Sequence, residues 1–588
     1  MAQIDTALTR RSFVAGAAAL AGTAAAAIPA AQAFATESSA KDGKASAATG
    51  ATEGTLGSDG VWPSNGAILG ETPDWLGAEP QIADADIVQT YETDILVIGC
   101  GTGGMFAVAS AAEQGARVIG IDRFPVGVGI RDDLAAINSR YQQEWGTKID
   151  KFDFITMATQ YATGHVNQQL VGLFCDESGE TIDWYGDRLA ERDVVLWHEA
   201  GDDDEGDRYK HYATGHSPAW PSDEEGNQTL DGNTVLYDYA VEKGAEFHYS
   251  TQMVKLAKED GKVTGCIATN EDGDYVRYVA SKGTVVCTGG YSLNYDMMAA
   301  MQPWNLRIIG RNGSEPGAFG DGIKACLWAG AKMDETHSMM MFDRCALRPD
   351  QETGRATAES GDNGFFWIGS QPWLKVNADG KRFFNESGTY EGILHADEYQ
   401  KGHCHYTIFD SNWTTYVEQF QMHGCSRQIP FVNGAACDIP REVNEAVFLP
   451  QLLEAGQLIK ADTLEELAEG LGLPVDAFVA EVAHYNEMAA AGEDTDFGKE
   501  AHRLTPVDAA PFYGCKNTGY VLCTLDGIQI DTNLNALDVN GEPIEGLYVI
   551  GNDSGCYFAN TYPNLATGMA CGRTVTFGRH IGKYLAAK

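Results

Sequence analysis

A glycine-rich turn between an apolar strand and an alanine-rich helix constrains the fold of this chain more than any other feature. Residues 95–98 (Ile-Leu-Val-Ile) lead directly into residues 99–104 (Gly-Cys-Gly-Thr-Gly-Gly). Gly99 permits the tight turn, Gly101 lets a pyrophosphate approach the backbone, and Gly104 lets the helix pack closely on the strand. The N-terminus of that helix presents free N–H groups and a partial positive charge. The pattern predicts a dinucleotide site between a parallel strand and a helix.

A second strand follows the helix and ends in an acidic residue. Residues 117–122 read Arg-Val-Ile-Gly-Ile-Asp, so Asp122 is expected at the carboxyl end of a strand beside the first. A carboxylate there can accept hydrogen bonds from both hydroxyls of an adenosine ribose, which favours NAD or FAD over NADP. The alternative is an ordinary glycine-rich turn, but the flanking strand and helix and the terminal acid together favour the dinucleotide.

Two further strand-plus-glycine units occur far along the chain, at residues 283–290 and 546–552. Each reads as a short buried strand that delivers a glycine turn to a ligand. Because such units lie at both ends of the chain, we expect one α/β, Rossmann-like domain, residues 91–336 and 514–588, interrupted by an inserted α+β capping domain at 337–513. Within the insertion, Thr463 predicts the start of one helix and residues 475–490 predict another.

The first residues predict an export signal. Residues 9–14 (Thr-Arg-Arg-Ser-Phe-Val) precede an uncharged, alanine-rich stretch with small-residue cleavage options, which indicates a twin-arginine signal peptide over residues 1–35. Residues 36–60 hold little to bury and are expected to form a disordered tether. The twin-arginine route carries folded proteins, so the periplasm or the cell surface is the expected location. A retained anchor is the alternative, and cleavage of the leader stays open.

The chain is strongly acidic, with a formal net charge of −42. This charge opposes nucleic acid or an anionic membrane as a partner; it favours a basic electron carrier, or simply solubility outside the cell. No apolar run after the tether approaches the ~20 residues that a membrane span needs. The 13 cysteines include no CxxCH motif, so the chain is expected to carry no c-type haem. His403-Cys404-His405 is poor metal-ligand spacing, and no metal is predicted.

The order of these segments resembles the flavoprotein family of fumarate reductases, succinate dehydrogenases, urocanate reductases and 3-ketosteroid dehydrogenases. The resemblance runs from Thr93 to Leu585 and rests on the first glycine turn, on residues 288–290 and 320–322, and on two later strings at 376–386 and 541–548. The most specific string is Gly-Lys-Arg-Phe-Phe-Asn-Glu, which ends at Glu386. The chain is also similar to secreted flavin reductases of anaerobes, including the cardiac glycoside reductase type.

The resemblance implies that the Rossmann-like domain binds FAD, with the isoalloxazine facing the cap and a small-molecule substrate between them. Hydride then passes between flavin N5 and a carbon beside an electron-withdrawing group, while a protein group exchanges a proton with the neighbouring carbon. Ordinary turn chemistry is the alternative for the later members of the FAD set. The residues implied in FAD binding are Gly99, Gly101, Gly104, Asp122, Thr288, Gly289, Asp321, Gly551, Asn552 and Asp553.

The chain departs from the fumarate reductases where that family grips two carboxylates with arginine. The last loop, residues 555–564, contains no arginine, Tyr390 stands where the relay arginine is expected, and Thr414 stands where the donor arginine is expected. Tyrosine and threonine cannot form the bidentate contacts that arginine makes with carboxylates, so a dicarboxylate substrate is not expected. Arg344 and Arg348 are the nearest cations that could grip a single carboxylate, but surface positions are expected for both.

Aromatic residues replace the missing cations. Tyr562, followed by Pro563, resembles the tyrosine of ketosteroid dehydrogenases that hydrogen-bonds a ketone, and a phenol with a pKa of ~10 can polarise a carbonyl or donate a proton. Tyr390 and Glu386 are predicted to share in catalysis, with a proton relay as the role of Glu386 and an ion pair as the alternative. Further rings suit an aromatic or polycyclic substrate, or else form the core of the cap: Tyr557, Phe558 and Trp413.

Three functions stay open at this point. The first is an exported FAD reductase that saturates an activated C=C bond in an enone or enoate and receives electrons from a separate cytochrome. The second is a dehydrogenase that desaturates a ketosteroid-like substrate and needs an electron acceptor. The third is a flavin carrier or sensor without turnover, which the polar residues around Tyr562 disfavour.

Overall fold

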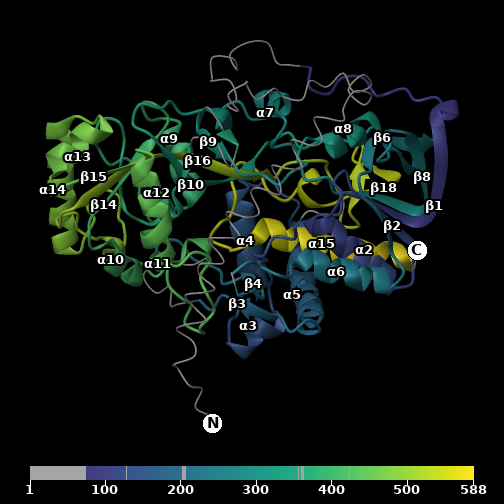
Figure 1. Cartoon of the computed structure of the whole chain (residues 1–588), viewed down its shortest axis with the longest axis horizontal. Helices are drawn as coiled ribbons and strands as arrows, with labels where there is room; N and C mark the ends of the chain where they lie inside the picture. The colour runs from purple at the N-terminus through teal and green to yellow at the C-terminus, as the bar shows by residue number, and fades with distance from the viewer. Residues whose placement is uncertain are drawn as a thin grey trace, which may run out of the picture.

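The computed structural model describes residues 74–588 apart from 128, 202–206, 225, 355–356, 359–362 and 423, and only the backbone of 357–358. The predicted signal peptide and tether, residues 1–60, lie outside the described residues. Figure 1 shows two parts: the Rossmann-like domain, with β1, β2, β8 and β18, and the cap, with α13 and α14 at the opposite end. In the part of the chain that is described, no helix is both long and apolar enough to cross a membrane.

Parallel strands form the centre of the Rossmann-like domain. β1 (Ile87–Ile98) lies between β2 (Val118–Ile121) and β8 (Tyr275–Val286). The sheet continues with β18 (Pro543–Val549) beside β8 and β5 (Glu246–His248) beside β2. The strands predicted from the three glycine units are therefore neighbours in one sheet. Their carboxyl-terminal halves are buried, which explains their continuous apolar runs.

Antiparallel strands extend this sheet and form a small separate ribbon. β7 (Lys262–Thr269) pairs with β8 and with β6 (Gln252–Glu259), and β17 (Asn535–Leu537) pairs with β18. β3 (Val195–His198) and β4 (His216–Ala219) form a two-stranded ribbon of their own. The end of this ribbon contacts the cap, because the carbonyl of His198 accepts a hydrogen bond of 2.6 Å from Asn433.

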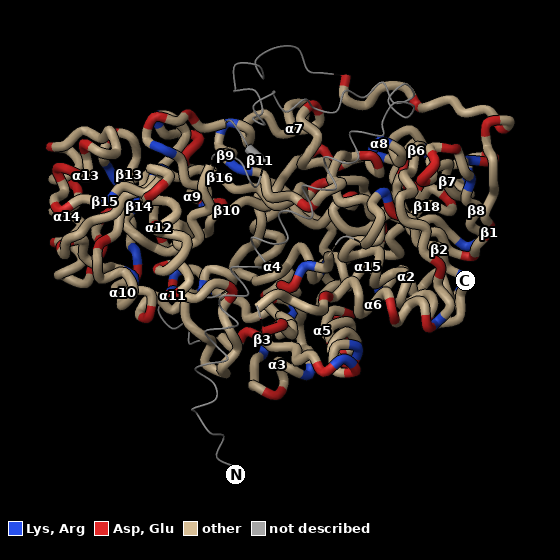
Figure 2. Tube along the Cα trace, viewed as in Figure 1, with Lys and Arg blue, Asp and Glu red and all other residues tan. Residues whose placement is uncertain are grey.

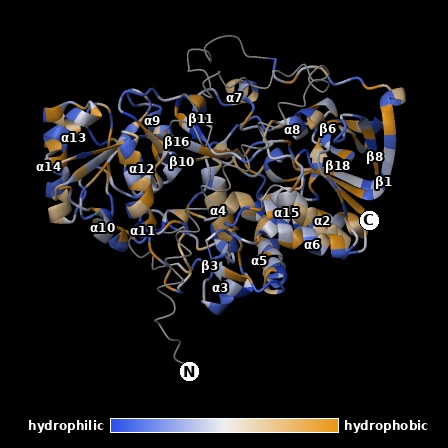
Figure 3. Cartoon of the chain, viewed as in Figure 1, coloured by the Kyte–Doolittle hydropathy of each residue, from blue (hydrophilic) through white to orange (hydrophobic). Residues whose placement is uncertain are grey.

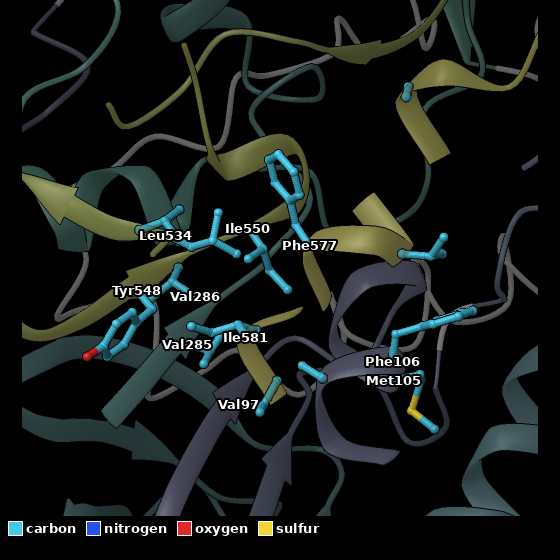
Figure 4. Packing of buried hydrophobic residues seen from close by; sticks show 14 of the residues in the cluster. Val97, Met105, Phe106, Val285, Val286, Leu534, Tyr548, Ile550, Phe577 and Ile581 are labelled. Carbon is cyan, nitrogen blue, oxygen red and sulfur yellow. The ribbon is translucent and has the colours of Figure 1, made fainter. Parts of the chain in front are cut away.

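Two helices cover the glycine-turn end of the sheet in close contact. α2 (Thr102–Glu113) packs along α15 (Met569–Ala587), and a side chain at Gly578 would collide with the backbone of Gly103. Figure 4 shows Phe577 and Ile581 of α15 in the same core cluster as Val97, Val285 and Ile550. α2 is correspondingly coloured toward the hydrophobic end of the scale in Figure 3. The remaining helices of this domain are α3 (Arg140–Glu144), α4 (Lys151–Tyr161), α5 (Gln168–Ala190), α6 (Gly232–Glu242), α7 (Tyr295–Met301) and α8 (Asp321–Trp328).

The cap is built on a second sheet, with β16 (Phe512–Thr524) at its centre. β16 pairs with β10 (Met339–Leu347), β9 (Ile309–Asn312), β14 (His405–Phe409) and β15 (Leu458–Ala461). The sheet is completed at its edges by β11 (Thr357–Ala358), β12 (Gly364–Phe365) and β13 (Leu374–Val376). β9 and most of β16 lie outside residues 337–513, so the sheet of the cap extends past the predicted borders on both sides.

Helices cover the sheet of the cap, and the predicted pair is present. The Thr463 side chain accepts a hydrogen bond of 3.2 Å from the N–H of Glu466, which starts α13 (Leu464–Leu471), and α14 (Val475–Ala491) follows. Trp413 is 4% exposed and belongs to the core of the cap, as the second interpretation of that ring held. The other helices of the cap are α9 (Tyr390–Asp397), α10 (Trp413–Gln419), α11 (Arg441–Val443) and α12 (Leu449–Glu454).

Candidate active site

The glycine turn has the geometry that its sequence predicts. Gly99 has a φ of +98°, and a Cβ on it would collide with the carbonyl of Cys287 at the end of β8. A Cβ on Gly104 would collide with the carbonyl of Gly99, so α2 sits as close to the turn as glycine allows. Gly101, by contrast, caps α2 and has no atom within 4 Å of its Cβ position. The turn therefore leaves open space at a helix N-terminus, where a phosphate fits.

Asp122 follows β2 and ties the glycine turn to the next loop. Its carboxylate accepts hydrogen bonds from the N–H of Cys100 at 2.7 Å and from the N–H of Phe124 at 3.0 Å. Burial raises the pKa of Asp122 above its usual value, while these two N–H groups act in the opposite direction. The predicted ribose ligand thus lies at the carboxyl edge of the sheet, next to the turn, with each oxygen already accepting one backbone hydrogen bond.

The second and third glycine units meet at Asp553, which is fully buried. Its carboxylate accepts hydrogen bonds of 2.9 Å from the Thr288 hydroxyl and from the N–H of Gly290, and Thr288 in turn accepts one of 3.0 Å from the N–H of Gly322. Asp553 and Thr288 therefore hold the two turns and the start of α8 together. Of the other predicted FAD residues, Gly289 and Gly551 have positive φ, Asn552 is half-buried, and Asp321 pairs with Arg123 at 3.1 Å.

Tyr562 lies in the last loop, against the first turn of α15. Its phenol oxygen accepts a hydrogen bond of 3.0 Å from the N–H of Ala570, and the residue is 4% exposed. Burial raises the pKa of the phenol well above its usual value. The backbone N–H of Tyr562 donates at 2.5 Å to Glu391, a residue of the cap. This contact joins the last loop of the Rossmann-like domain directly to the cap.

Glu391 is a buried carboxylate that the sequence interpretation missed. It accepts three hydrogen bonds, from the N–H of Met341, from the hydroxyl of Thr561 at 2.6 Å and from the N–H of Tyr562. Burial raises its pKa to about 8, against the opposing effect of these three donors. The sequence signal for it is an acidic residue within the otherwise apolar start of α9, because a charged residue there needs buried hydrogen-bond partners.

Tyr390, beside Glu391, contacts a buried arginine. The Ser426 hydroxyl donates to the Tyr390 hydroxyl, and Arg344 Nη2 donates to the same Ser426 oxygen at 3.2 Å. Arg344 is 2% exposed, so the expected surface position is wrong for Arg344, whereas the Arg348 side chain is 41% exposed and pairs with Asp350. The sequence signal was present, because Arg344 lies inside the apolar strand β10. Its guanidinium lies over three aromatic rings: Trp367 at 3.9 Å, Phe342 at 4.5 Å and Tyr390 at 5.4 Å.

Glu386 lies inside the cap, in a network of buried ion pairs. Arg382 binds both of its carboxylate oxygens, at 2.9 and 2.8 Å, and Lys499 Nζ lies 3.5 Å away. Burial alone would raise the pKa of Glu386, but Lys499 and Arg382 hold it below its usual value. No hydrogen bond among the described residues joins Glu386 to Tyr390 or Tyr562. Tyr390 instead contacts Ser426, and Tyr562 contacts Glu391.

Three carboxylates from separate segments gather where the cap meets the Rossmann-like domain. Asp133 precedes α3, Glu199 directly follows β3, and Asp438 belongs to the cap. Burial and the charges of the other two raise the pKa of Glu199, and burial raises the pKa of Asp438 to about 6. Asp133 also acts electrostatically on Tyr562. These acids were not predicted, because no local pattern joins them.

Comparison with known proteins agrees with this geometry. The FAD binding domain family matches residues 94–568. The vinyl phenol reductase of Lactiplantibacillus plantarum is 26% identical over 501 residues, which is 84% of this chain and 96% of that protein. The digoxin reductase of Eggerthella lenta is 24% identical over 543 residues, covering 86% of this chain and 88% of that protein.

Solved structures share the fold. A flavocytochrome c3 fumarate reductase superimposes with a TM-score of 0.59 at 24% identity, over 86% of this chain and 79% of that one. The 3-ketosteroid-Δ4-(5α)-dehydrogenase of Rhodococcus jostii superimposes with a TM-score of 0.61 at 20% identity, over 86% and 99% of the two chains. Three observations agree on FAD as the cofactor. They are the open surface at Gly101, the turns held by Asp553 and the family match over most of the chain. The chain belongs to the FAD binding domain family and is an FAD-dependent oxidoreductase.

Proposed function

We propose that this protein reduces an activated C=C bond in an enone or enoate, at the junction of the cap and the last loop. Bound, reduced FAD would supply hydride to one carbon of that bond. The observation that carries the proposal is that a buried cation and a phenol meet at this junction: the Arg344 guanidinium lies 5.4 Å from the Tyr390 ring, and the next residue, Glu391, accepts a hydrogen bond from the N–H of Tyr562. Such a reaction needs both a cation or hydrogen-bond donor for the electron-withdrawing group and a proton donor for the other carbon.

Tyr562 suits the role of proton donor. Its high pKa keeps the phenol protonated at physiological pH. The N–H of Ala570, at the positive end of α15, donates to the phenol oxygen and so stabilises the negative charge that proton transfer leaves there. Tyr390 is assigned a positioning role, because its hydroxyl fixes Ser426 and Ser426 in turn binds Arg344.

Glu386 is proposed as the far end of a polar chain that holds Arg344. Lys375 connects the two, because its backbone N–H donates to Glu386 at 3.3 Å and its ammonium binds Asp343 at 2.9 Å. Asp343 accepts a hydrogen bond of 2.6 Å from Ser370, and Ser370 accepts one of 2.9 Å from Arg344 Nε. Glu386 would thus act through position and charge within the cap.

The direction of the reaction is tested with the purified holoenzyme. The flavin is reduced chemically without oxygen, and its absorbance is followed as enones and enoates are added, with buffer alone as the control. Reoxidation faster than with buffer supports the reductase. If no compound accelerates reoxidation but saturated ketones reduce the oxidised flavin, the result supports the ketosteroid-type dehydrogenase instead. If neither reaction occurs, the result supports the flavin carrier.

Replacement of Tyr562 by Phe tests the proton donor. We expect the reoxidation rate to fall about 100-fold or more, in the range that general acids contribute, while FAD content stays the same. Tyr557→Phe is the matched control, since Tyr557 is a fully buried ring of the same domain that the mechanism does not use. An unchanged rate in Tyr562→Phe would remove Tyr562 from the mechanism.

We also propose that electrons come from a separate cytochrome and that the protein is exported by the twin-arginine route to the periplasm or cell surface. The absence of CxxCH from the sequence and the net charge of −42 support a separate, basic donor. Acidic residues occur along the chain in both parts of the molecule (Figure 2). One relative, 25% identical, is the fumarate reductase (cytochrome) of Shewanella frigidimarina. The first point is tested by reducing the protein with a basic cytochrome, a reaction that should slow as salt increases. The second point, export, is tested by cell fractionation of an Arg10→Lys, Arg11→Lys variant.

A further inference from the structure

The last loop has little regular structure of its own around Tyr562. Residues 554–568 lie outside the helices and strands. Two residues before Tyr562, Asn560 has a φ of +62°, in the left-handed region that residues other than glycine rarely adopt. The N–H of Asn564 donates to the carbonyl of Tyr562 at 2.9 Å, a bond that spans only two residues. Contacts from outside the loop therefore have to fix the position of Tyr562.

Tyr562 is held at two points, by two different parts of the molecule. Its phenol oxygen accepts a hydrogen bond of 3.0 Å from the N–H of Ala570 in α15, and its backbone N–H donates to Glu391 of the cap at 2.5 Å. The Thr561 hydroxyl donates to the same carboxylate oxygen of Glu391 at 2.6 Å. The Rossmann-like domain thus fixes the phenol, and the cap fixes the backbone that carries it.

Glu391 is itself firmly placed within the cap. It is fully buried, and its other oxygen accepts a hydrogen bond of 2.7 Å from the N–H of Met341 in β10. It is the second residue of α9, whose N-cap, Thr389, accepts a hydrogen bond of 3.1 Å from the N–H of Gly392. A carboxyl group has acceptor oxygens in both of its protonation states, so the contacts with the loop can form in either state. The cap therefore offers the loop a fixed acceptor.

The contacts of Glu391 limit what it can do in the reaction. No hydrogen bond in the described part of the chain joins its carboxyl group to the phenol oxygen of Tyr562, so it is not assigned a role in proton transfer. Its bonds go to the backbone N–H of Tyr562 and to the neighbouring hydroxyl, and these determine position. Position matters for the rate, since a displacement of about 1 Å in a catalytic group can cost about 100-fold.

We propose that Glu391 is a positioning residue that holds Tyr562 in place for proton donation, so that the last loop presents its proton donor only when the cap is docked on it. The inference rests on the proposed function and adds a regulation of the same site. Tyr390, the preceding residue of α9, contacts Ser426, which binds Arg344. The first turn of one cap helix therefore positions both the proton donor and the cation.

Replacement of Glu391 by Leu removes both acceptor oxygens at similar volume. The reduced holoenzyme is mixed with benzalacetone, an enone, and with cinnamate, an enoate, and the faster of the two with the native protein is used throughout. We expect reoxidation to slow about 100-fold at unchanged FAD content. Glu391→Gln keeps one acceptor oxygen and should stay within about tenfold of the native rate. Glu391→Met is the second variant, in case Glu391→Leu does not bind FAD.

Asp397→Asn is the matched control. Asp397 is a fully buried acid of the same helix, and it contacts His405 Nδ1 of β14 at 2.8 Å. Its replacement changes a buried carboxyl group of α9 without touching the last loop, so the native rate is expected. A loss in Asp397→Asn as large as in Glu391→Leu would mean that any disturbance of α9 slows the reaction, and would overturn the inference.

A double-mutant cycle separates positioning from a general structural role. If Glu391 acts through Tyr562, then adding Glu391→Leu to Tyr562→Phe should lower the rate by less than about threefold, because the phenol that Glu391 positions is already gone. A further loss of about 100-fold in the double variant would show that Glu391 acts independently of Tyr562, and would overturn the inference.

Amide hydrogen exchange, measured by mass spectrometry on the holoenzyme, follows the loop without turnover. The N–H of Tyr562 should exchange at least about tenfold faster in Glu391→Leu than in Asp397→Asn. Unchanged exchange, or an unchanged rate of reoxidation in Glu391→Leu, overturns the inference and leaves the proposed function standing. If neither probe reoxidises the native protein, the proposed function fails, and the assignment of Glu391 to proton donation fails with it.

Discussion

Two groups of carboxylates in this protein have pKa values that are shifted in opposite directions. In the cap, Glu386 and Asp494 share Arg382 and Lys499, every one of these side chains is fully buried, and the pKa of each acid lies below its usual value. At the junction, burial raises the pKa values of Asp133, Glu199 and Asp438, against the opposing charge of Arg344 on Asp133 and Asp438 and of Arg427 on Glu199.

The difference lies in the balance of charges. Burial raises the pKa of a carboxyl group in both places, and only a sufficient number of cations can reverse that effect. In a buried network in which every charge has a partner, the attraction offsets much of the desolvation cost, whereas acids without enough cations are favoured in the protonated form. The ion pairs of the cap are therefore assigned to structure, and the acids at the junction are expected to make the stability of the protein depend on pH.

The largest expected effect comes from unbalancing the cap. Arg382→Met removes a guanidinium that binds Glu386 and Asp494 at 2.8 and 2.9 Å. We expect the free energy of unfolding to fall by about 3–5 kcal/mol, the usual result of leaving a buried charge without its partner. Urea unfolding followed by circular dichroism measures it. Arg192→Met, which breaks an exposed pair with Asp238, should cost less than about 1 kcal/mol; equal losses in the two variants would erase the distinction between the regions.

An intermediate effect is expected at Glu391, which has three hydrogen-bond donors and no cation. Its pKa of about 8 in the folded protein exceeds the ordinary value of 4.5, so the folded state holds a proton that the unfolded state has lost. Stability from this group is present at low pH and decreases as the pH rises toward about 8. Glu391→Gln should therefore gain stability relative to the native protein, by about 1–3 kcal/mol between pH 5 and pH 9.

Thermal unfolding of both proteins at several pH values measures this change at Glu391. The quantity to follow is the difference between the two melting temperatures, because the lost acceptor bonds contribute a constant offset at every pH. A difference that does not vary with pH would mean that the donors keep Glu391 ionised throughout.

The smallest effect is expected at Asp438, which is half-buried at the junction. Its pKa of about 6 means that stability decreases as the pH rises from the ordinary value of 3.8 to about 6, and the full penalty applies above that. Asp438→Asn should thus stabilise the protein by about 1 kcal/mol at pH 8 and by nothing measurable at pH 4. If Asp438→Asn instead loses stability at pH 8, the ionised form of Asp438 is stabilised in the folded protein, as it is for the acids paired with Arg382 in the cap.

The parts of the fold that were predictable are those encoded in short segments. The strand, glycine turn and helix around Gly99 and the capped helix after Thr463 depend on neighbouring residues, and the structure confirms them. The order of the three glycine units along one sheet followed from the rule that parallel strands bring their carboxyl ends to one edge. The association of FAD with that edge was predictable for the same reason.

The junction cluster was not predictable, for a physical reason. Asp133, Glu199, Arg344 and Asp438 belong to four segments, and each is locally ordinary. They meet only because the cap folds back over the β3–β4 ribbon and the start of α15. Arg344 was the one member with a local signal, since a charged residue within an apolar strand needs buried partners.

The position of β16 has a mechanical consequence. This strand is both the centre of the cap sheet, paired with β9, β10, β14 and β15, and the last connection back to the Rossmann-like domain. The chain also crosses between the two parts on either side of α8, since β9 and β10 belong to the cap sheet, so a rotation of the cap has to be accommodated in those segments as well as in the residues that follow Thr524. There Asp526, fully buried, accepts hydrogen bonds from Tyr291 and His337. One buried carboxylate thus ties together three segments at the border of the two parts: Tyr291 after β8, His337 before β10 and the end of β16.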